Sequence, residues 1–321
     1  MKVLHITNAY PTEKYGAFGI FIKEQINSLN ALGINNDVFF INAYEKGGAE
    51  YLKAVLRLIG KCGKYDIIHC HHSYSGMVYL LSNPFFRKPL VFSNLGDINK
   101  QKREIDRRLF HYISKKASAV IYKNDMKLIE KESKKFHYIP NGVNTDHFRP
   151  IDKSEAKRKL DLDVNKNYAL FVSASGTKSG IKRYDKFCDT LNIAEEKGIK
   201  LEPLVMTGAE RNIVPFYFNA ADIMILTSDH EGSPNAVKEA MSCDLAVVST
   251  DVGNVLKMLE GCKASFVAES NTALDLSELV IRSLSIKDRN ERETIFKKEL
   301  DMKSVADRIR ALYESVLKKG R

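Results

Sequence analysis

The stretch TSDHEGSPNAVKEAMSCDLAVVSTDVG, residues 227–253, constrains the fold more than any other part of the chain. It follows the apolar run DIMIL, crosses a polar loop that contains a glycine and a proline, and continues through a helical segment into the run LAVVST. Strand, loop, helix and strand in this order form the repeating unit of a parallel sheet that is covered by helices. The stretch therefore predicts an α/β fold.

The same alternation extends in both directions from this stretch. The first half has predicted strands at 2–7, 37–42, 66–71, 89–93, 118–122 and 136–139, and the second half has them at 168–173, 201–207, 222–227, 245–250 and 264–268. Charged amphipathic helices from about residue 273 to residue 318 close the chain. The pattern is thus repeated twice, which predicts two doubly wound, Rossmann-like domains.

A linker is indicated between the two halves. The segment PNGVNTDHFRPIDKSE, residues 140–155, combines two prolines with a glycine and several turn-forming Asn and Asp residues. A chain of 321 residues is also long enough for two domains of about 150 residues each. We predict a first domain over residues 1–150 and a second over 151–321, with the last helix able to pack back on the first domain.

The cellular compartment is indicated by the lack of a signal peptide, of a membrane span and of paired cysteines in the sequence. The apolar run VLHI near the start is too short for a signal peptide, and no run approaches the roughly 18 residues that a membrane span needs. The five cysteines are an odd number without a CxxC pair, which is typical of reduced thiols. We expect a cytoplasmic protein that is soluble or peripheral on the inner face of the plasma membrane.

The net charge of +10 is confined to the first half, where residues 1–150 hold 23 Lys and Arg against 13 Asp and Glu, while residues 151–321 hold 27 of each. A basic domain favours an anionic partner, namely a membrane surface, a lipid pyrophosphate, an acidic glycan or nucleic acid. A solvated lysine-rich surface is the alternative. Nucleic acid is disfavoured because the chain has no helix-turn-helix, zinc-finger or RNA-binding aromatic motif.

Within that basic half, the segment EYLKAVLRLIGKCGKY, residues 50–65, has the composition of a membrane-surface helix. Its apolar residues alternate with basic ones at helical spacing. The apolar set is Leu52, Val55, Leu56 and Ile59, and the basic set is Lys53, Arg57, Lys61 and Lys64. Packing of the apolar set in the core, with a basic outer face, is the alternative interpretation.

The loop of the opening stretch carries the residues that are best suited to chemistry. Ligands of open α/β sheets bind beyond the carboxyl ends of strands, where Glu231 lies. Pro234 or Asn235 opens the helix, whose first turn offers backbone N–H groups to an anion, and Glu239 lies about one turn further on. Glu231 as an ordinary loop charge and Glu239 as a surface residue remain the alternative interpretation.

This segment resembles the Glu-x7-Glu signature of retaining GT-B glycosyltransferases, in particular glycosyltransferase family 4 (glycosyl transferases group 1), of the bacterial surface-polysaccharide type. Further motifs of that family follow in the family's order, namely YGAFG, DIIHCH, IPNGVNTDHF and NAADIMILTSDHEG. The resemblance implies two Rossmann-like domains that face a central cleft, with the acceptor on the first domain and the nucleotide-sugar donor on the second.

The resemblance also implies residue roles. Glu231 would contact the donor sugar, Glu239 the ribose, and Lys182 the diphosphate, while His71 would face the sugar. The remaining implied donor-binding residues are Gly16 and Gly19 in the first loop and the backbone groups of Gly232, Ser233, Pro234, Asn235 and Ala236. Arg183 is added to the donor-binding set as a substitute cation, for the reason given next. No metal or other cofactor is expected, because Lys182 and a helix N-terminus balance the diphosphate.

Two positions depart from the family pattern. Many members have a Gly-Arg pair after the strand YALFVS, whereas this chain reads Ser173, Ala174, Ser175, Gly176, so that Arg183 or Lys178 would have to supply the second cation. Leu95 also replaces the usual histidine before Gly96 and Asp97, which weakens the transfer of acceptor-side roles to that loop.

Two metal motifs are competing interpretations. His69, Cys70, His71 and His72 could suggest zinc. However, neighbouring strand residues point to opposite faces, so Cys70 cannot readily join His69 and His71, and we expect His69 to be a core histidine satisfied by the backbone. The sequence Asp161-Leu162-Asp163 has the form of a DxD motif but follows a helical segment, so we expect a helix end there.

The predicted activity is transfer of a sugar, by a retaining hexosyltransferase, from a nucleoside-diphosphate sugar to a hydroxyl of a glycan or a polyprenyl-pyrophosphate-linked acceptor in polysaccharide biosynthesis. UDP is favoured by its frequency in the family. A hydrolase or epimerase of nucleotide sugars with the same fold, or a catalytically silent nucleotide-sugar-binding protein, is the alternative.

Overall fold

The computed structural model describes residues 1–16, 18–84, 88–94, 104–123, 134–173, 176–178 and 180–319. The chain forms two compact units, of which the first is Met1–Gly142 with Met302–Arg321 and the second is Val143–Asp301. Residues 143–150 thus group with the second unit, whereas the sequence division placed them in the first. The reason is that Phe148 is buried in the second unit's core and Val143 pairs with Asp301.

The first unit contains a six-stranded sheet in the order β2-β1-β3-β4-β5-β6, in which every neighbouring pair is parallel. Its strands are β1 (Lys2–Thr7), β2 (Asn35–Phe40), β3 (Ile67–His71), β4 (Leu90–Asn94), β5 (Ala119–Tyr122) and β6 (Phe136–Tyr138). Alternate residues of the strands face opposite sides, so Leu4 and Ile6 pack in one core while Val3 packs in another.

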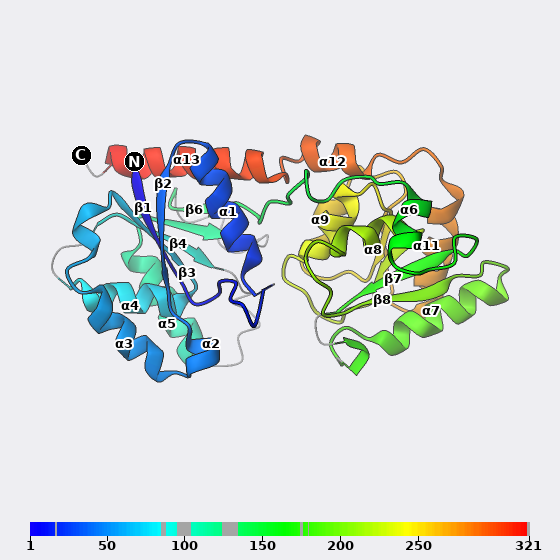
Figure 1. Ribbon diagram of the computed structural model, residues 1–321, viewed down its shortest axis with the longest axis horizontal. Helices are drawn as coiled ribbons and strands as arrows, with labels where there is room; N and C mark the ends of the chain where they lie inside the picture. The colour runs from blue at the N-terminus through cyan, green and yellow to red at the C-terminus, as the bar shows by residue number, and fades with distance from the viewer. Residues whose placement is uncertain are drawn as a thin grey trace. The chain divides into compact units, whose positions relative to one another are not determined.

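Two helix layers cover this sheet (Figure 1). One face is covered by α1 (Ile20–Ala31) and α13 (Met302–Lys319), and the other by α3 (Ala49–Leu58), α4 (Ser73–Ser82) and α5 (Glu104–Lys116). The short α2 (Ala43–Lys46) and the 3-10 helix η1 (Cys62–Lys64) flank α3. The C-terminal helix therefore completes the core of the first unit, with Ile309 and Tyr313 fully buried.

The second unit contains a five-stranded parallel sheet in the order β11-β10-β9-β7-β8. Its strands are β7 (Tyr168–Val172), β8 (Glu202–Met206), β9 (Ile223–Leu226), β10 (Val247–Ser249) and β11 (Phe266–Val267). One face is covered by α6 (Lys153–Lys159), α8 (Val214–Ala220), α9 (Asn235–Ser242), α10 (Val255–Leu259) and α12 (Glu291–Lys297), and the other by α7 (Tyr184–Glu196) and α11 (Ala273–Ser285). The 3-10 helix η3 (Gly176–Lys178) follows β7.

Both sheets share one topology, which confirms the predicted α/β fold with two parallel sheets. In each, the first strand lies between the second and the third, as β2-β1-β3 and as β8-β7-β9. Ligands of such sheets bind at the carboxyl ends of the two strands where the order reverses. The edges after β1 and β3, and after β7 and β9, are therefore the places to look for a site.

Among the described residues, no helix combines the length and the apolar character that a membrane-spanning segment needs.

Candidate functional site

In the second unit, hydrogen bonds join the loops that follow β7 and β9 at the carboxyl edge of the sheet. The Thr227 hydroxyl lies 2.9 Å from the carbonyl oxygen of Lys182, and the Asp229 N–H donates to the carbonyl of Ile181 at 2.9 Å. These contacts fix Lys182 beside the loop that carries Glu231, although the two residues are 49 positions apart in the sequence.

Lys182 and Glu231 form an ion pair at this edge. The Lys182 Nζ lies 2.5 Å from the Glu231 Oε1, and the Ser228 hydroxyl donates to the same oxygen at 2.8 Å. The two side chains are 27% and 16% exposed, so a ligand can still reach them. The structure thus brings together two of the residues predicted for catalysis, as a fixed cation beside a fixed anion.

Helix α9 starts next to this pair. Of the two predicted starts, Asn235 opens the helix and Pro234 is the residue before it, and no side chain caps the first turn. The Asn235 Oδ1 is buried without a hydrogen-bond partner. Since the first N–H groups of a helix carry its positive end, this turn suits an anionic group.

The shape of the loop before α9 depends on a close backbone contact. Gly253 has a φ of +59°, and a Cβ added there would lie 2.1 Å from the carbonyl oxygen of Gly232. The same carbonyl accepts the Asn254 N–H at 3.2 Å, and the Asn254 amide donates to the Ser233 hydroxyl at 3.2 Å. Only glycine at 253 therefore allows the segment after β10 to support the loop that carries Glu231.

Glu239 lies one turn inside α9, where it pairs with a residue that the sequence analysis missed. The Arg211 Nη1 lies 3.2 Å from the Glu239 Oε1, and the guanidinium packs over the Phe148 ring, 4.6 Å from its centroid. The His147 Nε2 lies 3.0 Å from the Arg211 carbonyl oxygen. Arg211 follows β8, so its place after a strand was the signal that could have identified it.

The two candidates for a second cation lie in different surroundings. Arg183, immediately before α7, has a φ of 53° and pairs with both Asp185 and Asp229, whereas Lys178 is exposed at the end of η3. Arg183 is therefore already balanced by two carboxylates. The family departures at 174–175 and at 95–97 lie outside the described residues.

In the first unit, the loop after β1 carries the two predicted glycines. Gly19 directly precedes α1 with a φ of +72°, and a Cβ there would lie 2.3 Å from the carbonyl carbon of Ala9. Gly16 has no atom within 4 Å of the position of such a Cβ. Close packing thus requires glycine at 19 and does not require it at 16.

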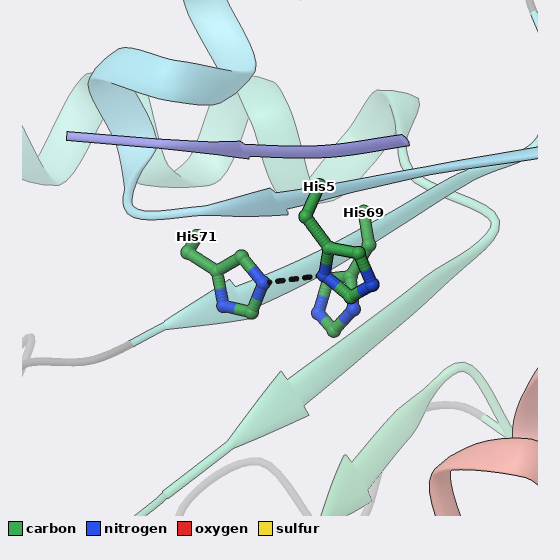
Figure 2. A group of neighbouring side chains, drawn as sticks. All are labelled: His5, His69 and His71. Atoms are coloured by element: carbon green, nitrogen blue, oxygen red, sulfur yellow. Dashed lines mark hydrogen bonds between the residues drawn. The ribbon is translucent and has the colours of Figure 1, made fainter. Parts of the chain in front are cut away.

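His71 belongs to a buried group of three histidines on adjacent strands (Figure 2). His5 on β1 is in register with His69 on β3, and the His5 Nδ1 lies 3.0 Å from the His71 Nε2. The His5 Nε2 lies 2.9 Å from the Asn36 Oδ1. His5 could not be identified from the sequence, because its contact with His71 depends on β1 and β3 being neighbours in the sheet.

The third ring of this group has two hydroxyl partners. The His69 Nδ1 lies 2.5 Å from the Tyr313 hydroxyl of α13, and its Nε2 lies 2.7 Å from the Ser93 hydroxyl. His69 is thus a core histidine as expected, but side chains satisfy it and not the backbone, which corrects that part of the expectation. His72 instead precedes α4, where its ring accepts the Tyr74 N–H.

One ring nitrogen from each of the three histidines lies within 4.8 Å of the other two, which is close enough for all three to bind one metal ion. Cys70 packs in the core on the other side of the sheet, as the strand alternation predicted. The surroundings do not favour a dication. Both nitrogens of His69 have hydroxyl partners, and burial, with a smaller contribution from the ammonium of Lys123, lowers the pKa of His69 and of His71, so that positive charge is disfavoured there. The group fits a hydrogen-bonded network of neutral rings better than a metal centre.

The DxD spelling is accounted for by a helix end, as predicted. Helix α6 ends at Lys159, and Asp161 has a φ of 55° in the turn that follows.

We predict that acid destabilises the first unit through this histidine group. Burial lowers the pKa of His5 to about 4 and those of His69 and His71 well below their usual value. Because the unfolded chain takes up these protons near pH 6.5, the free energy of unfolding should fall as the pH drops from about 6.5 towards 4, by about 1.4 kcal/mol per pH unit for each histidine.

Urea denaturation followed by circular dichroism between these pH values measures that slope. His5→Gln removes one of the three titrating rings and should reduce the slope, while His111→Gln on the exposed side of α5 should leave it unchanged. An unchanged slope in His5→Gln would contradict the prediction.

At the second sheet, a cation and two carboxylates thus lie around a helix start at the reversal of strand order, which is where open α/β sheets bind their ligands. The overall structure is similar to that of sucrose-phosphate synthase from Thermosynechococcus elongatus, with a TM-score of 0.79 and 17% sequence identity over 99% of both chains. The chain therefore has the GT-B fold of glycosyltransferases.

Residues 180–285 match the family described as Glycosyl transferases group 1. Over 98% of its length, and 94% of the relative's, the chain is 23% identical to TuaC of Bacillus subtilis, which is named provisionally as a teichuronic acid biosynthesis glycosyltransferase. It is 22% identical, over 78% of its length and 75% of the relative's, to the UDP-Gal:alpha-D-GlcNAc-diphosphoundecaprenol alpha-1,3-galactosyltransferase of Escherichia coli. The chain thus carries a glycosyl transferases group 1 domain and is a glycosyltransferase.

Proposed function

We propose that the protein is a retaining hexosyltransferase of glycosyltransferase family 4. It would move a sugar from a nucleoside-diphosphate sugar, preferably a UDP-sugar, to a hydroxyl of a glycan or lipid-linked acceptor in polysaccharide biosynthesis. The observation that carries the proposal is the Lys182–Glu231 pair next to the uncapped start of α9, at the carboxyl ends of β7 and β9.

In this proposal the donor lies along the first turn of α9. The diphosphate accepts hydrogen bonds from the helix start and is paired with Lys182, which offsets the charge that develops as the nucleoside diphosphate departs. Glu231 accepts hydrogen bonds from the sugar hydroxyls. Glu239, which is held in place by its ion pair with Arg211, accepts hydrogen bonds from the ribose hydroxyls. These groups supply the charge balance without a metal ion, which is why we propose metal-independent transfer.

Retention is proposed to follow a front-face route. The bond between the anomeric carbon and the diphosphate oxygen breaks, the acceptor oxygen bonds to the same face of that carbon, and the acceptor proton passes to the departing diphosphate. Glu231 then positions the sugar and does not attack it. The role of His71 in orienting the sugar stays part of the proposal, in which His5 would hold the His71 ring in one tautomer.

The acceptor is proposed from charge and from the relatives. The excess of positive charge lies in the first half of the sequence, which suits a pyrophosphate-linked acceptor. The name of the Escherichia coli relative specifies a diphosphoundecaprenol-linked acceptor and a UDP-linked donor. Such a substrate would place the enzyme on the cytoplasmic face of the membrane where surface polysaccharide is assembled.

The test is product formation from UDP-sugars with a polyprenyl-pyrophosphate-linked acceptor, with the anomeric configuration read by NMR. Transfer with retention is expected. In Glu239→Ala the KM for the donor should rise by about 10- to 100-fold with a smaller change in kcat, because a charged hydrogen bond to the ribose is lost.

The matched control is Glu196→Ala, which removes an exposed carboxylate at the end of α7 and should leave the KM for the donor unchanged. Inversion of configuration would reject the retaining route. Donor cleavage that is indifferent to acceptor would identify a hydrolase, and donor binding without turnover would identify a silent binding protein.

A further inference from the structure

Helix α3 exposes a stripe of large aliphatic side chains. Leu52 and Leu56 are each 72% exposed and Ile59, just past the helix end, is 56% exposed. Their spacing of four and then three residues places them on one side of the helix. The opposite side, with Glu50, Ala54 and Leu58, is the buried one. Of the four apolar residues in the predicted set only Val55 packs against the core, so core packing is wrong for the other three.

Helix α3 lies at the border of the layer that covers one face of the first sheet, with α4 on its inner side (Figure 1). Nothing in the part of the first unit that the structure describes covers the stripe, given those exposures. Clustered apolar side chains on a surface usually mark an interaction site, whereas single ones do not.

Basic side chains border the stripe. Lys53 and Arg57 follow on the adjacent side of α3, and Lys61 and Lys64 come directly after it, all of them exposed. The only acid between residues 49 and 64 is Glu50, which is 6% exposed and pairs with Arg57 at 2.6 Å. The outward surface of α3 is therefore apolar in the middle and positive at its border.

This combination distinguishes a bilayer from the other possible occupants. A second copy of the chain that met this surface through the same stripe would bring two sets of lysines together, and like charges repel. An anionic phospholipid surface offers both an apolar layer for the stripe and phosphate groups for the lysines within the width of one helix.

We propose that α3 binds the first unit to anionic phospholipid bilayers. Leu52, Leu56 and Ile59 enter the layer below the headgroups, and Lys53, Lys61 and Lys64 contact the phosphates. The inference does not rest on the proposed sugar transfer, because it would hold for any activity of the second unit.

The experiment is co-sedimentation of the full chain with vesicles. The chain should bind vesicles of phosphatidylcholine with about 30% phosphatidylglycerol at about 50 mM salt, and should bind more weakly at about 500 mM salt or without the anionic lipid. Leu52→Gln with Leu56→Gln should lower the partition coefficient by about tenfold or more. Lys61→Glu with Lys64→Glu should abolish the preference for anionic vesicles.

Matched controls exist in the second unit. Leu256→Gln with Leu274→Gln changes leucines that are 60% and 52% exposed, and Arg158→Glu with Lys159→Glu reverses two exposed charges at the end of α6. Both control pairs should bind vesicles as the wild type does. Circular dichroism checks that each variant is folded. We expect all of them to fold, because the changed side chains are exposed.

Three results would overturn the proposal. The wild type could fail to bind anionic vesicles at low salt, or a control pair could lose as much binding as the α3 variants. Light scattering could instead reveal a dimer that Leu52→Gln with Leu56→Gln dissociates, and the occupant would then be a second copy. Transfer to a water-soluble acceptor, measured in parallel, separates failure of this inference from failure of the proposed function.

Discussion

Glu231→Gln is expected to lower kcat for sugar transfer by about 10²- to 10³-fold, with a much smaller change in the KM for the donor. The substitution keeps the size of the side chain and its contact with the Ser228 hydroxyl, but it removes the negative charge that faces Lys182 at 2.5 Å. If the carboxylate positions the sugar for attack, its loss acts mainly on the transition state. Steady-state rates with saturating donor and acceptor measure the effect.

The matched control for this variant lies in the same loop. Asp229, two residues before Glu231, pairs with Arg183 and Lys186 on an exposed side of the loop, so Asp229→Asn should stay within about threefold of the wild type. A kcat of Glu231→Gln near that of the wild type would remove Glu231 from the chemistry. It would leave the ion pair with a structural role only.

Lys182 provides a second readout. Because Lys182 and Glu231 form one ion pair, Lys182→Met combined with Glu231→Gln should cost less than the product of the two single effects. Independent, multiplying losses would instead indicate that the two side chains act on separate parts of the donor.

The donor loop could be predicted from sequence because its decisive features are local. A polar loop with glycine and proline between a buried strand and a helix indicates to within one residue where the helix begins, and Asn235, one of the two predicted starts, opens α9. The position of Glu239 one turn into the helix follows from helix geometry alone. Lys182 could be placed only by resemblance, because its approach to Glu231 depends on β7 and β9 being neighbours in the sheet.

The partners that the sequence did not reveal are all set by strand order. Arg211 meets Glu239 because the loop after β8 ends beside α9, and His5 meets His71 because β1 lies next to β3. Periodicity identifies strands but not which of them are neighbours. Residue spacing therefore gives no signal of such a partner, even where it matters for chemistry. Arg211 is the example, since it pairs with Glu239, the carboxylate proposed to bind the ribose.

Periodicity also leaves open which side of an amphipathic helix faces the core. In α3 the stripe of Leu52 and Leu56 is the more obvious apolar face, yet the small residue Ala54 and Leu58 are the buried ones. The tertiary structure decides between the two sides, because α3 packs against α4 through the side that carries Ala54 and Leu58.

Gly253→Ala is expected to abolish donor binding while leaving the rest of the fold intact. A Cβ at this position would lie 2.1 Å from the Gly232 carbonyl oxygen and 3.0 Å from that of Glu231, and backbone atoms cannot yield as a flexible side chain can. The loop must move away from the segment after β10, and Glu231 moves with it. We expect a loss of transfer of about 10²-fold or more, since small displacements of positioning groups are costly.

The cost of a positive φ has to be separated from this clash. Gly198, after α7, has a φ of +87° with no atom within 4 Å of an added Cβ, so Gly198→Ala has the backbone strain without the collision. Both variants should lose about 1 to 2 kcal/mol of stability from the left-handed conformation, but only Gly253→Ala should lose binding of UDP, measured by calorimetry. If the two variants bind UDP equally well, the contact between Gly253 and Gly232 does not hold the donor loop in its working shape.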